Sequence, residues 1–157
     1  MSDVAKHPWI KGDLRVARNV IERVDAEAVA AYGREEESCG LLLGPDADAL
    51  LVDEIVPMEN RANKLHRLDP ETYPRTGRMY FDIDPLKFER AVRAGESNGR
   101  PVKVLYHSHL DVGAYFSETY DLAYLVTSVR SGVVDDRKLF VWDGGARAFV
   151  ETALTIV

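Results

Sequence analysis

Apolar residues in this chain follow two spacings, an alternation typical of strands and a recurrence typical of helices. Residues 14–18 alternate apolar and charged side chains, as an edge strand does. Apolar residues from Ile21 to Tyr32 recur at helical spacing, which predicts an amphipathic helix that ends near Gly33. Residues 38–43 form a short apolar run that predicts a buried strand.

The middle of the chain is predicted to contain a hairpin, a long loop and a capped helix. Residues 49–56 follow a turn and should pair with the preceding strand. Residues 57–78 are polar and rich in proline, so we expect a loop that is functional or mobile. A strand is expected at residues 79–83, and Asp84 should cap a helix of residues 85–95. The expected apolar face of that helix comprises Leu86, Phe88, Ala91 and Val92.

The remaining apolar runs lie in the C-terminal half. They predict strands at residues 102–106, 124–129, 138–142 and 149–156. With the helices already named, these strands indicate an α/β (α+β) fold, in which a mixed β-sheet is flanked by helices.

The length and composition of the chain fit one folded domain. Hydrophobic residues make up 46% of its 157 residues, which is enough to form a core. We expect residues 1–12 to be a flexible arm and residues 13–157 to be the domain. No apolar run approaches the roughly 20 residues that cross a bilayer, and no signal peptide is evident, so a cytoplasmic location without membrane contact is expected.

Charge and cysteine content limit the kinds of site that the chain can contain. The net charge is −6, which argues against nonspecific nucleic-acid binding. The single cysteine, Cys39, lies in an apolar run and is expected to be a packed side chain. One cysteine excludes a multi-cysteine zinc site, including that of a nucleobase deaminase. Any metal must therefore be held mainly by histidine and carboxylate.

The segment His107-Ser108-His109 directly follows an apolar strand. In extended backbone, residues i and i+2 point to the same side, so both imidazoles can reach one cation while Ser108 faces away. Alone, a pair at this spacing is also compatible with two polar residues at a strand end.

The surrounding residues resemble a known family. Glu37 stands far upstream, at the start of Glu-Ser-Cys-Gly-Leu-Leu-Leu-Gly, and Ser117 lies eight residues after His109. This combination resembles the JAMM (MPN-plus) metallopeptidases, whose motif is Glu, a long gap, His-Ser/Thr-His, seven residues, Ser, two residues, Asp. The resemblance covers roughly residues 14 to 156 and is greatest to the small stand-alone bacterial members.

The resemblance implies an MPN-like domain with a zinc site at a strand end. His107 and His109 would be zinc ligands, and Glu37 would carry a proton between water and the leaving amine. Ser117 would donate a hydrogen bond to the oxyanion. The implied enzyme is a zinc peptidase or isopeptidase acting on a protein or peptide, including the Gly-Gly C-terminus of a ubiquitin-like sulfur carrier.

The third zinc ligand departs from the family motif. The family aspartate position is occupied by Tyr120, and Asp121 follows one residue later. Three explanations stay open. Asp121 ligates zinc through an altered turn, Glu118 replaces it, or a segment containing the ligand is missing between Ser117 and Tyr124.

The displaced aspartate also keeps a second function open, a metal-free MPN-like scaffold that binds partners without hydrolysis. Two residues of the expected loop, His66 and Asn60, are further candidates for contact with a substrate.

Overall fold

The computed structural model describes residues 8–114 and 122–157 and shows a mixed sheet with helices on both faces. The strands of the main sheet are β2 (Cys39–Leu43), β4 (Glu54–Met58), β5 (Val102–Leu110), β6 (Ala123–Arg130), β7 (Val133–Asp143) and β8 (Ala148–Thr152). Their spatial order is β4-β2-β5-β6-β7-β8, and only the β5–β6 pair is parallel. This arrangement confirms the predicted α+β class.

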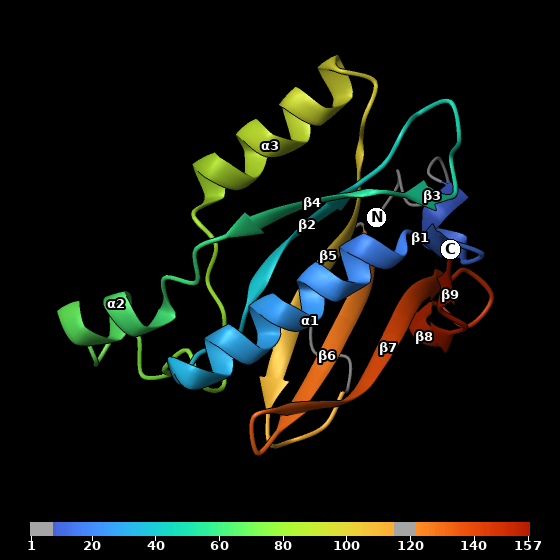
Figure 1. The fold of residues 1–157 in the computed structure, drawn as a ribbon. Helices are drawn as coiled ribbons and strands as arrows, with labels where there is room; N and C mark the ends of the chain where they lie inside the picture. Colours follow the sequence, from blue (N-terminus) through green and yellow to red (C-terminus); the bar gives the residue numbers. More distant parts are fainter. Residues whose placement is uncertain (1–7, 115–121) are drawn as a thin grey trace.

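One face of the sheet is covered by α1 (Arg18–Gly33), which runs across the strands in Figure 1. Its buried side chains pack with residues of β5 and β6 such as Val104 and Leu125. The helix ends at Gly33, as its spacing predicted. The buried side chains of this helix are Val20, Ile21, Val24, Ala28 and Ala31.

The opposite face of the sheet packs against Phe81 and α3 (Pro85–Ser97). The Asp84 side chain caps this helix, as predicted, by accepting a 2.9 Å hydrogen bond from the backbone N–H of Leu86. Phe88, Ala91 and Val92 pack against the core, but the Leu86 side chain is 62% exposed, so its predicted place on the apolar face was wrong.

Three short strands form a separate parallel sheet near the chain ends (Figure 1). Its order is β3-β1-β9, from β1 (Arg15–Val16), β3 (Leu51–Val52) and β9 (Thr155–Ile156). The predicted edge strand β1 is therefore central, because β3 and β9 pair with its two sides. The predicted strands 49–56 and 149–156 each divide between the two sheets.

The stretch from residue 57 to residue 84 differs most from its prediction. It contains a helix, α2 (Ala62–Leu68), which is short and polar and so gave no apolar period. Residues 79–83 form no strand, which corrects the prediction. Side chains take the place of a neighbouring strand here, since Asn60 bonds the backbone of Tyr80 and Asp82.

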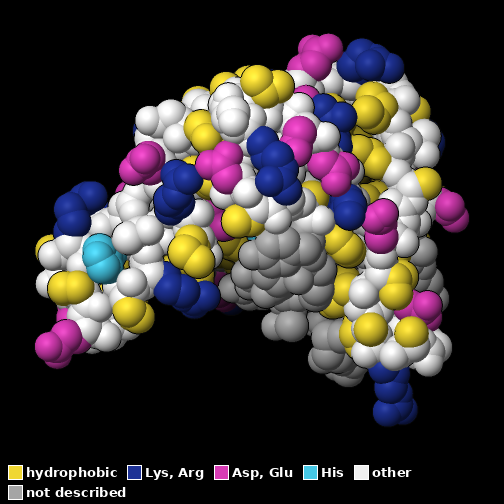
Figure 2. Space-filling model, turned by 90° about the horizontal axis from the view of Figure 1, so that it is seen from below, with side chains coloured by type: hydrophobic (Ala, Val, Ile, Leu, Met, Phe, Trp, Pro, Cys, Tyr) yellow, Lys and Arg dark blue, Asp and Glu magenta, His cyan; other side chains and the backbone are white. Residues whose placement is uncertain are grey.

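The described part of the expected N-terminal arm makes contacts with the core. Residues Pro8–Lys11 form a 3-10 helix, and Trp9 is buried in the cluster beneath α1. None of the helices in residues 8–114 and 122–157 has both the length and the apolar character of a membrane crossing. Acidic and basic side chains are interspersed on the face shown in Figure 2, and those drawn in colour form no continuous basic surface.

A buried lysine fixes the turn between β2 and β3. The Lys103 ammonium donates hydrogen bonds to the carbonyls of Pro45 (3.0 Å), Asp48 (3.0 Å) and Leu51 (2.8 Å). The residue is fully buried, so these bonds replace its hydration.

We predict that Lys103→Met lowers the free energy of unfolding by about 3 kcal/mol, because it leaves three buried carbonyls without their donor. Urea denaturation measures the change. Lys87→Met, on the exposed face of α3, is the matched control and should stay within about 0.5 kcal/mol of the parent. Equal stability of the two variants would contradict a structural role for Lys103.

Candidate metal centre

Glu37 lies where the chain leaves α1 and enters β2, and its side chain points into the protein. The backbone N–H of Glu37 donates a 2.6 Å hydrogen bond to the carbonyl of Gly77, and its own carbonyl accepts one of 3.0 Å from the Asn60 amide. Glu37 is only 5% exposed. It is therefore not part of a solvated charge run, although two glutamates precede it.

His107 and His109 lie on one face of β5, in the middle of the sheet. β5 is longer than predicted and includes both histidines, which are almost completely buried. The spacing i, i+2 brings their rings together, with centroids 5.0 Å apart. The ring of Phe81 stacks on that of His107 at 4.8 Å. These contacts hold the imidazoles beneath the loop that precedes α3.

Ser108 faces the other way, as the alternation predicts. Its hydroxyl accepts a 2.8 Å hydrogen bond from the backbone N–H of Ser38, and its own N–H donates to the Ser38 carbonyl. These bonds extend the pairing of β5 with β2. Close approach is possible because β2 contains Gly40, where an added Cβ would lie 2.5 Å from the Tyr106 hydroxyl oxygen.

Glu37, His107 and His109 form one buried group. One possible ligand atom from each lies within 4.8 Å of the others. Glu37 Oε1 is 3.6 Å from His107 Nδ1. His109 Nδ1 is 2.7 Å from the carbonyl oxygen of Gly113, so Nδ1 carries the proton and Nε2 is the nitrogen that can coordinate a metal ion. Two imidazoles and a carboxylate are a donor set that zinc accepts, so the residues fit a divalent metal ion.

Burial sets the protonation of this group. It raises the pKa of the Glu37 carboxyl to about 8, against the opposing charges of His109 and Arg75. It also lowers the pKa of His109, and the charge of His107 acts in the same direction. The neutral imidazole that results is the form that binds metal, and a cation in the site would favour the charged form of Glu37.

Other residues named from the sequence are placed elsewhere or lie outside the description. Ser117, Glu118 and Asp121 lie outside the described residues. His66 is on α2, with Nδ1 2.8 Å from the carbonyl oxygen of Tyr73, and is not in the metal group. Cys39 is a buried side chain whose thiol pKa burial raises, as expected of a packed hydrophobe.

Asn60 has a structural role that its sequence position does not indicate. Its amide nitrogen donates to the carbonyls of Glu37 and Tyr80, both at 3.0 Å. Its oxygen accepts from the N–H groups of Ala62 (2.9 Å) and Asp82 (3.1 Å). All four hydrogen-bonding positions of the amide are thus used within the protein. Asn60 positions Glu37 and has no capacity left for the substrate contact considered above.

Asp111, at the end of β5, also escaped the sequence analysis. Its carboxylate accepts hydrogen bonds from the hydroxyl of Tyr32, the guanidinium of Arg78 and the N–H of Ser131. These three partners come from α1, the 69–84 segment and the β6–β7 turn. Asp111 therefore ties the strand end beyond His109 to its surroundings, and only the folded chain brings these partners together.

Comparison with known proteins places the fold. The profile of the Prok-JAB family, described as prokaryotic homologs of the JAB domain, matches residues 17–143. No curated protein sequence matches the chain. Among solved structures, protein DSY2949 from Desulfitobacterium hafniense superimposes with a TM-score of 0.64, 23% identity and 92% coverage of both chains.

Two further solved structures are similar. A protein from Salinibacter ruber gives a TM-score of 0.60 at 20% identity and covers 92% of each chain. AF2198, a JAB1/MPN domain protein from Archaeoglobus fulgidus, gives 0.54 at 16% identity and covers 93% of this chain and 100% of its own. At these identities the likeness shows the shared fold.

We predict that Asn60→Ala lowers the free energy of unfolding by about 2–3 kcal/mol, because the two carbonyls and two N–H groups that bond the Asn60 amide lose their partner. Urea denaturation measures the change. Asn19→Ala, on the exposed side of α1, is the control and should leave the stability unchanged. Equal stability of the two variants would contradict a structural role for Asn60.

Proposed function

The chain belongs to the prokaryotic homologs of the JAB domain, and from this premise we propose that it is a zinc-dependent peptidase or isopeptidase that hydrolyses amide bonds. The observation that supports the proposal most directly is the buried group of Glu37, His107 and His109. Two imidazoles and a carboxyl group have no other evident use at this depth in the protein.

His107, His109 and Glu37 have separate roles in the proposed reaction. His107 and His109 would hold a zinc ion, and the Gly113 carbonyl orients His109. When bound, zinc would supply Lewis-acid chemistry, polarising the scissile carbonyl and lowering the pKa of water to about 7. Glu37 takes the proton of the attacking water and delivers it to the leaving amine, as a buried carboxyl with a raised pKa is suited to do.

Two roles rest on the family resemblance and on residues outside the described part of the chain. Ser117 donates a hydrogen bond to the oxyanion. Asp121 is the proposed third protein ligand, and its one-residue displacement leaves Glu118 and a ligand in a segment missing between Ser117 and Tyr124 as alternatives.

The proposed substrate is a protein or peptide with an extended tail. Resemblance to the small bacterial members supports the Gly-Gly C-terminus of a ubiquitin-like sulfur carrier, bound as an added strand. A cytoplasmic location stays a prediction.

We predict near one zinc per chain by elemental analysis, and near zero for the double variant with His107→Ala and His109→Ala. Glu37→Gln should keep its zinc but hydrolyse amides about 10²–10⁴-fold more slowly, because it cannot carry the proton. Activity is measured on a sulfur-carrier protein extended by one residue beyond its terminal Gly-Gly. Glu35→Gln, an exposed neighbour, is the matched control with parental activity.

The outcomes separate the alternatives. Loss of zinc in Glu37→Gln would make Glu37 a ligand rather than the proton carrier. A parent chain that stays zinc-free after zinc addition would refute the hydrolase and leave the metal-free scaffold.

A further inference from the structure

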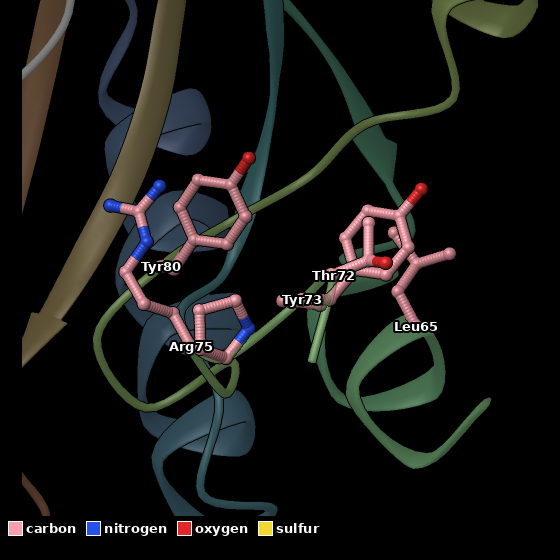
Figure 3. A pocket seen from close by; sticks show the side chains of 7 residues that line it. Leu65, Thr72, Tyr73, Arg75 and Tyr80 are labelled. Atoms are coloured by element: carbon pink, nitrogen blue, oxygen red, sulfur yellow. The ribbon is translucent and has the colours of Figure 1, made fainter. Parts of the chain in front are cut away.

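A pocket in the segment that anchors Glu37 is not used by the proposed mechanism. It lies between α2 and the segment of residues 72–80 and has a volume of about 200 Å³. Figure 3 shows Arg75 and Tyr80 on one side of it and Leu65 and Tyr73 on the other. Pockets for drug-sized ligands measure roughly 300–1,000 Å³, so this one suits a single residue of a larger ligand.

Arg75 presents a positive charge at this pocket. Its guanidinium lies over the ring of Tyr80, 3.9 Å from the centroid, which orients it. The neighbouring arginines have carboxylate partners, Asp82 for Arg61 and Asp111 for Arg78. Among the described residues, Arg75 forms no such ion pair. Its five donors therefore remain available to an anion.

Hydrogen bonds connect the pocket to the metal centre. Asn60 donates one to the Glu37 carbonyl and one to the Tyr80 carbonyl, and the Glu37 N–H donates to the carbonyl of Gly77, two residues after Arg75. The Tyr80 side of the pocket and the backbone of Glu37 are thus held by the same Asn60 amide.

The charges around Glu37 favour Arg75 as the position of an anion. A second pocket at Glu37, of about 180 Å³, is lined by the carboxylates of Glu27, Glu36 and Glu59, with Arg34 bonded to Glu36. That pocket repels a carboxylate. None of the described residues lining the Arg75 pocket is acidic.

We propose that Arg75 and its pocket bind a carboxylate-bearing residue of the substrate next to the scissile amide. This inference rests on the proposed function and adds the substrate class. Arg75 pairs with the carboxylate, while Tyr73, Tyr80 and Leu65 contact the rest of the residue. The carboxylate is either the α-carboxylate of a C-terminal residue or the side chain of an acidic one, because both offer the same planar pair of acceptors.

Three N-acetylated tripeptides test the proposal in the zinc-free full chain. Gly-Gly-Gln with a C-terminal amide is neutral, Gly-Gly-Gln with a free C-terminus carries the α-carboxylate, and Gly-Gly-Glu amide carries the side-chain carboxylate. Binding is measured by NMR titration. Without zinc, no carboxylate can bind the metal and no peptide is hydrolysed.

We predict that at least one anionic peptide binds about tenfold more tightly than the neutral one, with shifts at Leu65, Tyr73 and Tyr80. Arg75→Met should abolish the preference and Arg75→Lys should keep part of it, since lysine retains the charge without the planar fork. Arg67→Met, on the exposed side of α2, is the matched control and should keep all of it. The peptide that shows the preference identifies the source of the carboxylate.

Equal binding of all three peptides, or a preference that persists in Arg75→Met, would overturn the proposal. If the NMR spectrum shows that Arg75→Met is unfolded, the test is whether Arg75→Lys has a reduced preference for the anionic peptide. An Arg75-dependent preference in a chain that never hydrolyses an amide would uphold the pocket and refute the hydrolase. Hydrolysis of amides by a chain that shows no preference for the anionic peptides would uphold the hydrolase and refute the pocket.

Discussion

Burial of the Glu37 carboxyl between two histidines is the constraint on which the rest of the structure depends. An ionised carboxylate is stable at this depth only when a proton or a cation neutralises it. Burial raises its pKa to about 8, while His109 is held neutral. Without metal, the group keeps a proton at neutral pH. With metal, the same three side chains offer two nitrogens and an oxygen. The Glu37 carboxylate is therefore compensated either by a proton or by a metal ion.

Such a group must be held from outside, because its members attract one another only weakly when uncharged. Glu37 is fixed through its backbone, by Gly77 on one side and Asn60 on the other. The histidines are fixed by the strand that carries them, which lies between β2 and β6. Asp111 secures the end of that strand through three partners. The centre thus depends on the sheet for its histidines and on loop hydrogen bonds for its carboxylate.

This division explains what could be predicted from the sequence. α1, α3, β2 and β5 follow apolar patterns because their burial is decided by local period, and the metal group was predicted from the residue types and the family motif. Residues 79–83 were wrongly predicted as a strand, because Asn60 and Arg61 occupy the backbone groups of Tyr80 and Asp82. α2 has seven residues and one buried side chain, too few for a period to emerge. Apart from the bond between Asn60 and Ala62, the bonds of Asn60 and Asp111 span about 20 or more positions and have no local signature.

The histidines of the metal group lie on the sheet, whereas the Arg75 pocket lies in the 59–84 segment. The 59–84 segment contributes no strand to the main sheet, and its side chains that hold the site are Asn60 and Phe81, which stacks on His107. Gly77 is a further fixed point, since a side chain there would meet Glu36, with a Cβ 2.9 Å from its Cβ. Arg75 lies between Asn60 and Gly77 in the sequence. A change that moves the pocket wall also moves the anchors of Glu37, because Asn60 bonds both. In the proposed function, substrate contact at the pocket and proton transfer by Glu37 would therefore be linked through the Asn60 amide, although no described side chain of the pocket belongs to the metal group.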